Sequence, residues 1–102
     1  MKPIDNTKHS EIPTKIFKKT IQPYFDEIAS GKKQFDVRIN DFEVNVGDII
    51  VLQEWDESMK KYSGRELEFK VGYLLKTKDV EAYTKEDIEK YGFVVMSLTN
   101  NK

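Results

Sequence analysis

The sequence predicts a small α+β domain with about five mostly antiparallel strands and two short helices. Its 102 residues allow a single domain, because domains usually contain roughly 100 to 150 residues. Stretches with a two-residue apolar period are typical of strands, and two short segments carry helix start and stop signals. Strands and helices do not alternate regularly, and the sequence has no internal repeat. This order favours one strongly curved or barrel-like mixed sheet.

The first expected element is a strand that begins at Lys15, after a flexible arm over residues 1–14. The arm carries two prolines and no sustained apolar period. The strand is rich in β-favouring residues and ends before Pro23, which suits the first turn of a helix over about 23–30. Gly31 supplies the left-handed residue that commonly ends a helix.

Two further strands are expected in the middle of the chain. Apolar and polar residues alternate over 35–39, which predicts a half-buried strand with Asp36 and Arg38 together on its polar face. Residues 49–52 are apolar on both faces, as in a central strand. A turn-rich link joins the two.

A hairpin is expected next. Residues 55–64 are polar, and we expect them to close the hairpin with a turn at 62–65. Apolar residues then alternate with charged ones over 67–75, which predicts a long strand with one buried face.

The chain is expected to close with a short helix and a last strand. Thr84 and Asp87 resemble a capping box in which Asp replaces the usual Glu, and Gly92 marks the end of the helix. The apolar run 93–98 is the expected final strand, so the folded domain would cover residues 15–99.

The composition excludes several kinds of chemistry. The chain has no cysteine and a single histidine, His9, so disulfides, thiolate nucleophiles, zinc fingers and a Ser-His-Asp triad are excluded. An acidic stretch lacks the spacing of a calcium-binding EF-hand: Asp41, Glu43 and Asp48. We therefore expect no metal and no cofactor.

The start of the chain has no apolar leader, and no apolar run approaches the roughly 18 residues of a membrane span. We expect a cytoplasmic protein without a membrane partner. The formal net charge is −1, so a basic field over the whole molecule is absent and any anion site must be local.

Charge is nevertheless segregated along the chain. Residues 15–38 hold six bases and three acids, whereas residues 39–59 hold six acids and no base. We expect one basic surface and one acidic surface. The acids of the second segment are Asp41, Glu43, Asp48, Glu54, Asp56 and Glu57.

The densest polar cluster lies at 30–38, where the first helix ends and feeds a strand. Lys32 and Lys33 offer point charges, and Arg38 offers a planar fork of donors beside Asp36. Such a patch can hold a phosphate or the polar edge of a base. It can equally consist of cations near a helix C-terminus and a surface ion pair.

Motifs spread over most of the chain resemble those of one family. They are Pro23-Tyr24-Phe25, Ser30-Gly31-Lys32-Lys33, Phe35-Asp36-Val37-Arg38, Asn40-Asp41, Val46-Gly47-Asp48, Leu52-Gln53-Glu54-Trp55-Asp56, Tyr62-Ser63-Gly64-Arg65-Glu66 and Tyr91-Gly92-Phe93-Val94-Val95-Met96-Ser97-Leu98. In this order, over about residues 15–98, the chain resembles the ASCH family of PUA-like domains, and most of all a phage- and prophage-associated branch of it.

The resemblance implies a PUA-like pseudobarrel with a cleft beside the helix-to-strand junction. The implied partner is a nucleic-acid component, namely RNA, a nucleotide or a modified nucleoside. By this resemblance Lys33, Asp36 and Arg38 line the cleft, and the expected rim residues are Glu54, Trp55 and Arg65. Lys32 stays a candidate because it shares parity with Asp36 and Arg38, so Lys33 reaches the cleft only if the strand begins after it or contains a bulge.

Two alternatives remain open. Some small members of the ASCH family, which this chain resembles, are amidohydrolases. They remove the acyl group of N4-acylated cytidine with a Lys, a Thr and a Glu. Lys33 matches the Lys, but Asp36 stands at the Thr position and would act, if at all, as a general base. The other alternative is a phage-encoded interaction module that binds a host protein through the acidic surface.

Overall fold

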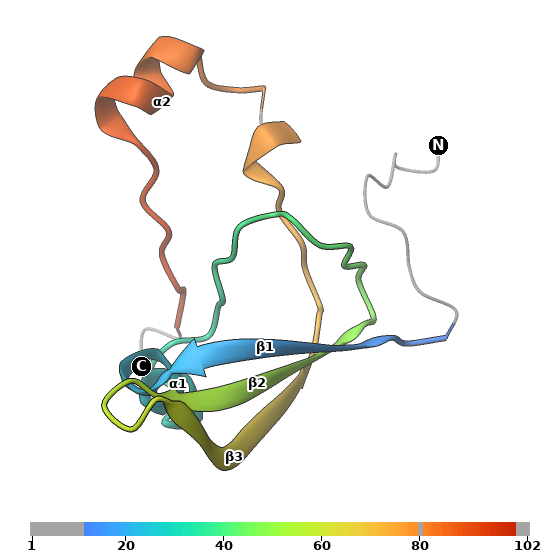
Figure 1. The fold of residues 1–102 in the computed structure, drawn as a ribbon. Coiled ribbons are helices and arrows are strands. Elements are labelled where there is room, and N and C mark those ends of the chain that lie inside the picture. Colours follow the sequence, from blue (N-terminus) through green and yellow to red (C-terminus); the bar gives the residue numbers. More distant parts are fainter. Residues whose placement is uncertain (1–11, 80, 100–102) are drawn as a thin grey trace.

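A computed structural model of the chain describes residues 12–79 and 81–99 (Figure 1). Most of the expected arm over 1–14 lies outside these residues. Thr14 is tied to the sheet, because its N–H donates to Asp48 Oδ1 at 3.2 Å and its carbonyl accepts from the Ile49 N–H at 3.0 Å. The arm therefore ends before the first strand.

The described sheet has three strands in the order β1-β2-β3. β1 (Lys15–Ile21) is parallel to β2 (Ile49–Asp56), and β2 is antiparallel to β3 (Lys61–Lys70). Parallel neighbours need a crossover connection, which here runs through α1 (Gln22–Ala29) and a long loop. The α+β class is confirmed.

A small core lies between α1 and the sheet. Phe25 and Leu52 are each 1% exposed, and Ile28 packs with them. Ile50 and Leu67 lie partly buried against this cluster. Burying a large apolar side chain contributes about 1.5–3 kcal/mol, so these contacts fix α1 on one face of β2.

Both helices begin and end as the sequence predicts. Pro23 lies in the first turn of α1, and Gly31 follows the helix with φ +84°. α2 (Lys85–Tyr91) follows a short 3₁₀ turn at Thr77–Asp79, and the Thr84 hydroxyl accepts from the Asp87 N–H at 3.1 Å. This confirms the predicted cap.

Two of the five expected strands do not form, so the prediction of strands over 35–39 and 93–98 is wrong. Both segments lie without regular secondary structure. Val37 is 64% exposed and Ile39 80% exposed, so the apolar side of the first segment is not covered. Alternation predicts a strand only where a neighbouring strand accepts its hydrogen bonds, and the loop is held to β1 by a side chain instead.

The hairpin also differs from the prediction. Its turn lies at residues 57–60, and residues 62–65 belong to β3, which ends at Lys70 rather than at 75. In the register, Gln53 pairs with Glu66 and Trp55 with Tyr62, so one residue of β2 faces three of β3. Gly64 takes φ +96° within this bulge, and β3 bends sharply along its length (Figure 1).

In the described ranges, 12–79 and 81–99, neither helix has the length and apolarity that a membrane crossing requires.

Candidate functional site

A pocket of about 430 Å³ lies beside the outer edge of β1. We call it the β1-edge pocket. Its lining comes from the end of β1, the first turn of α1 and the loop after α1: Lys19, Thr20, Ile21, Tyr24, Lys33, Asp36, Val37 and Arg38. The structure therefore brings together three residues predicted to line a cleft, Lys33, Asp36 and Arg38.

Arg38 holds the loop against β1. Its Nε donates to Asp36 Oδ2 at 2.8 Å, its Nη1 donates to the Lys19 carbonyl at 2.7 Å, and its Nη2 donates to Thr20 Oγ1 at 2.6 Å. The Arg38 side chain is 24% exposed. Three of its five N–H groups thus donate to acceptors within the protein. The main role of Arg38 is therefore to hold the pocket in shape, and only two donors remain for a ligand.

Asp36 presents a carboxylate to the pocket in a fixed orientation. Its Oδ2 accepts from Arg38, and no hydrogen bond to its Oδ1 occurs within residues 12–79 and 81–99. The side chain is 26% exposed. A carboxylate accepts at both oxygens, so Oδ1 is available to an N–H or O–H donor in the pocket.

Lys33 provides an ammonium group to the pocket. Its backbone N–H donates to the Glu27 carbonyl at 3.0 Å, which keeps Lys33 in the turn after α1 and outside any strand. Its Nζ lies 4.4 Å from the centroid of the Tyr24 ring, which is 51% exposed. Lys32 is exposed and does not line the pocket. Because no strand forms over 35–39, strand parity places no condition on Lys33, and this residue lines the pocket from the loop.

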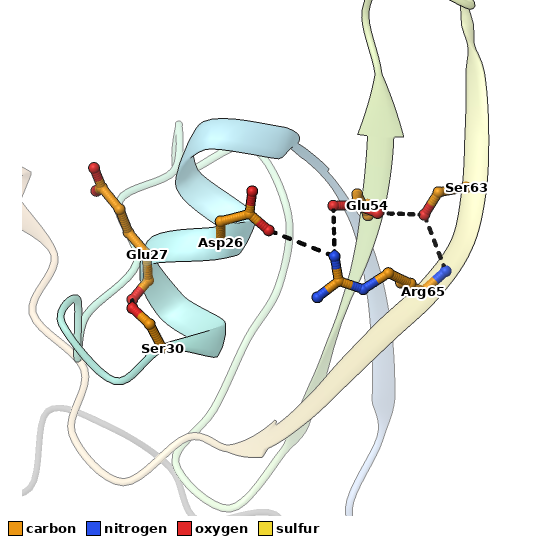
Figure 2. Close-up of polar contacts among 6 residues, drawn as sticks. All are labelled: Asp26, Glu27, Ser30, Glu54, Ser63 and Arg65. Atoms are coloured by element: carbon orange, nitrogen blue, oxygen red, sulfur yellow. Dashed lines mark hydrogen bonds and ion pairs between the residues drawn. The ribbon is translucent and has the colours of Figure 1, made fainter.

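Glu54 and Arg65 belong to a second polar group, the carboxylate cluster, made of Asp26, Glu54, Ser63 and Arg65 (Figure 2). Glu54 is only 3% exposed, and it accepts from Ser63 Oγ at 2.5 Å and from Arg65 Nη1 at 3.3 Å. Arg65 reaches from the bulge of β3 toward α1, where it contacts Asp26 at 3.5 Å. A buried carboxylate needs such partners, so the cluster ties the bent strand to α1.

The carboxylate cluster and the β1-edge pocket are neighbours across the sheet. Thr20 and Glu54 are register partners on β1 and β2, and both are 3% exposed. Paired residues of adjacent strands project from the same face of a sheet. Each therefore lies buried beside an arginine, Thr20 beside Arg38 and Glu54 beside Arg65.

Trp55 does not line the pocket, and it projects from the face of the sheet opposite to Glu54, because it follows Glu54 in the strand. The Nζ of Lys19 lies 4.4 Å from the centroid of the Trp55 ring, and Tyr62 meets the same ring edge-on at 4.9 Å between centroids. Lys19 thus touches both regions, with its carbonyl at the pocket and its ammonium on the indole.

The six acids of residues 39–59 do not form one acidic surface. Asp48 and Glu54 are buried, at 2% and 3% exposure. Glu57 pairs with Lys60 at 3.2 Å, and Asp56 Oδ1 accepts from the Ser58 hydroxyl and from two backbone N–H groups of the turn. Two of the six predicted members of the acidic surface therefore lie in the interior.

The turn changes the pKa of one of these acids. The pKa of Asp56 lies below its usual value of 3.8, mainly because the Ser58 hydroxyl donates to the carboxylate and secondly because the Met59 N–H does. Hydrogen bonds to the charged form of a carboxyl lower its pKa in this way.

Sequence reasoning missed Thr20 and Tyr24. Pro23 marks the strand-to-helix junction, so the position of Thr20 near the end of β1 and of Tyr24 in the first turn of α1 could have been inferred. That the loop after α1 folds back onto this edge could not, because it depends on the long-range contacts of Arg38. Among residues 12–79 and 81–99, no three acidic or histidine side chains come together as a metal site.

Residues 17–98 match one family, described as a domain of unknown function, DUF3850. No curated protein matches the chain. The match includes every residue that lines the β1-edge pocket. Since it covers most of the 102 residues, the chain belongs to the DUF3850 family.

Proposed function

We propose that this chain is a binding domain for a nucleic-acid component, namely RNA, a nucleotide or a modified base, in the β1-edge pocket. One observation carries the proposal. The pocket combines an exposed aromatic ring, Tyr24, with an ammonium, Lys33, and a carboxylate, Asp36, whose Oδ1 is available. These are the groups that stack on a base, neutralise a phosphate and pair with the edge of a base.

The size and placement of the pocket support this proposal. A volume of about 430 Å³ falls within the range of small-molecule sites, roughly 300–1,000 Å³. The pocket is local and contains the charged side chains of Lys33, Asp36 and Arg38, as the net charge of −1 requires of an anion site. A single nucleotide or a short segment suits such a site better than a long polyanion.

We also propose that the chain is an ASCH-type, PUA-like domain. The order of motifs from Pro23 to Leu98 supports this. The exposed apolar side chains of the loop after α1 and of residues 93–98 are of the kind that a more closed barrel would cover. They include Val37, Ile39, Val94 and Leu98.

Hydrolysis of an N4-acylated nucleoside is the second candidate. It is favoured by the Thr20 hydroxyl, which lines the same pocket as Lys33. However, Thr20 Oγ1 accepts from Arg38 at 2.6 Å and donates to the Lys18 carbonyl at 3.4 Å. A nucleophilic hydroxyl needs a base to take its proton, and here the proton is directed at a backbone carbonyl. We therefore prefer binding without turnover.

An NMR titration tests the proposed function. Short single-stranded RNA, nucleoside monophosphates, cytidine and N4-acetylcytidine are added in turn to the ¹⁵N-labelled chain. Binding in the pocket shifts the amides of residues 31–38 and of Tyr24, and leaves those of the 57–60 turn in place. A new product signal from N4-acetylcytidine would promote the hydrolase, and an unmoved spectrum across the panel would refute the proposed function.

A further inference from the structure

We infer that the β1-edge pocket reads the edge of a guanine base, with Asp36 as the residue that determines specificity. The inference rests on the proposed function and goes beyond it, because it selects one base among the nucleotides. It follows from which hydrogen-bonding groups the folded protein has already used and which it leaves to a ligand.

The hydrogen-bonding groups that the pocket leaves to a ligand differ in whether they donate or accept. Arg38 has three donors satisfied by the protein, and their acceptors are Asp36 Oδ2, the Lys19 carbonyl and the Thr20 hydroxyl. Two N–H groups of Arg38 remain as donors, and Oδ1 of Asp36 remains as the acceptor at a fixed position. Because Arg38 Nε holds Oδ2 at 2.8 Å, the plane of the carboxylate is set before any ligand arrives. A preoriented acceptor selects ligands that present donors.

The bases differ in how they meet a carboxylate. Guanine presents the ring N1–H and the exocyclic amino group side by side, so one donor can meet the free Oδ1 of Asp36 and the other the lone pair of Oδ2 that Arg38 does not use. Adenine and cytosine present an amino group next to a ring nitrogen acceptor, which faces the carboxylate lone pairs. Uracil presents one N–H between two carbonyl oxygens. Only guanine offers donors without an opposing acceptor.

Lys33 and Tyr24 complete the match. On guanine, the O6 acceptor adjoins N1–H on the side away from the amino group, so a cation beside the carboxylate completes the pattern. Lys33 lies half-buried in the same pocket as Asp36, and its flexible ammonium rests on the Tyr24 ring at 4.4 Å. The exposed ring can carry the purine face, and the ammonium can leave it for O6.

The test compares ligands that differ by single groups. Dissociation constants of GMP, IMP, AMP and UMP are measured by calorimetry with the full chain. IMP keeps N1–H and O6 but lacks the amino group, so we expect it to bind about tenfold more weakly than GMP, with AMP and UMP weaker still.

Two variants assign the preference to the carboxylate. Asp36→Asn places an amide donor against the donors of guanine, so we expect the ratio between the IMP and GMP constants to fall to about one. Lys32→Ala removes a charge outside the pocket and keeps the carboxylate and its partner Arg38, so its ratio stays near tenfold. The amide spectrum of each variant shows that it is folded.

The possible failures are distinguishable. If GMP, IMP, AMP and UMP bind with equal constants, the guanine inference is overturned and the proposed function stands. If none of the four binds but RNA or N4-acetylcytidine shifts the pocket amides, the guanine inference alone is overturned, and if no ligand of either panel binds, both are overturned. A ratio that survives Asp36→Asn, or that is lost equally in Lys32→Ala, overturns the role of Asp36.

Discussion

Replacing Arg65 with alanine removes the only charged partner that the described residues give to Glu54. Glu54 is 3% exposed, and after the change only Ser63 Oγ still donates to it. Arg65 also lies 4.9 Å from the centroid of the Phe25 ring and 3.5 Å from Asp26. The change therefore leaves a buried carboxylate nearly unpaired (Figure 2).

The expected cost can be worked out from these contacts. A hydrogen bond to a charged group contributes about 1.5–3 kcal/mol to folding. The lower part of that range applies, because the Arg65 side chain is 58% exposed and its Nη1 lies 3.3 Å from Glu54 Oε2. We expect a loss of about 2 kcal/mol in the free energy of unfolding. For a domain of this size that lowers Tm by about 8–16 °C.

Urea denaturation at neutral pH measures this loss, and a double-mutant cycle assigns it. Glu54→Gln removes the charge but keeps the shape, so Arg65→Ala made on that background should cost less than about 1 kcal/mol. If Arg65→Ala costs the same on both backgrounds, or changes the free energy by less than about 0.5 kcal/mol, the carboxylate of Glu54 does not depend on Arg65 and the reasoning is refuted.

Three further predictions concern stability and protonation. Arg38→Ala should lower the free energy of unfolding by about 2 kcal/mol and speed amide exchange over 34–40, whereas equal exchange rates would show that the loop is held otherwise. The Asp56 carboxyl should titrate below 3.8 by NMR, so its contribution to stability is complete above that pH and is lost as the pH falls through the lowered pKa. Ser58→Ala should return the Asp56 midpoint toward 3.8, and an unchanged midpoint would contradict the assigned cause. Gly64→Ala should destabilise the chain by about 1 kcal/mol because φ is +96°, whereas Gly72→Ala, which also meets open space but without a positive φ, is the matched control. Equal losses of stability in Gly64→Ala and Gly72→Ala would mean that the bulge does not require the positive φ of a glycine.

The elements that could be predicted are those whose signals are local. Pro23 and Gly31 bound α1, and Thr84 caps α2, because each acts through its own backbone or through a residue three positions away. The strand over 35–39 was predicted from alternation alone, which says nothing about whether a partner strand is present. The sequence predicts a turn at Gly64, but the positive φ of this residue belongs to a bulge inside β3.

In the candidate site, too, the local features could be predicted and the long-range ones could not. Lys33, Asp36 and Arg38 were found because they are close in sequence and share one loop. The contacts of Arg38 with β1 span about 18 residues, and the burial of Glu54 depends on the pairing of β2 with both neighbours. Neither follows from a periodicity. Long-range register therefore determines which polar residues line the pocket and which support the fold.

The central claim is that the β1-edge pocket, and no other basic part of the loop, binds a nucleotide. The most direct measurement compares two adjacent lysines that the sequence left undecided, by calorimetry with the nucleotide that shifts the pocket amides. Lys33→Ala should weaken binding about tenfold, because it removes a charged contact inside the pocket, and Lys32→Ala, outside it, should change the constant by less than about twofold. Equal losses in the two variants, or no loss with Lys33→Ala, would contradict the account.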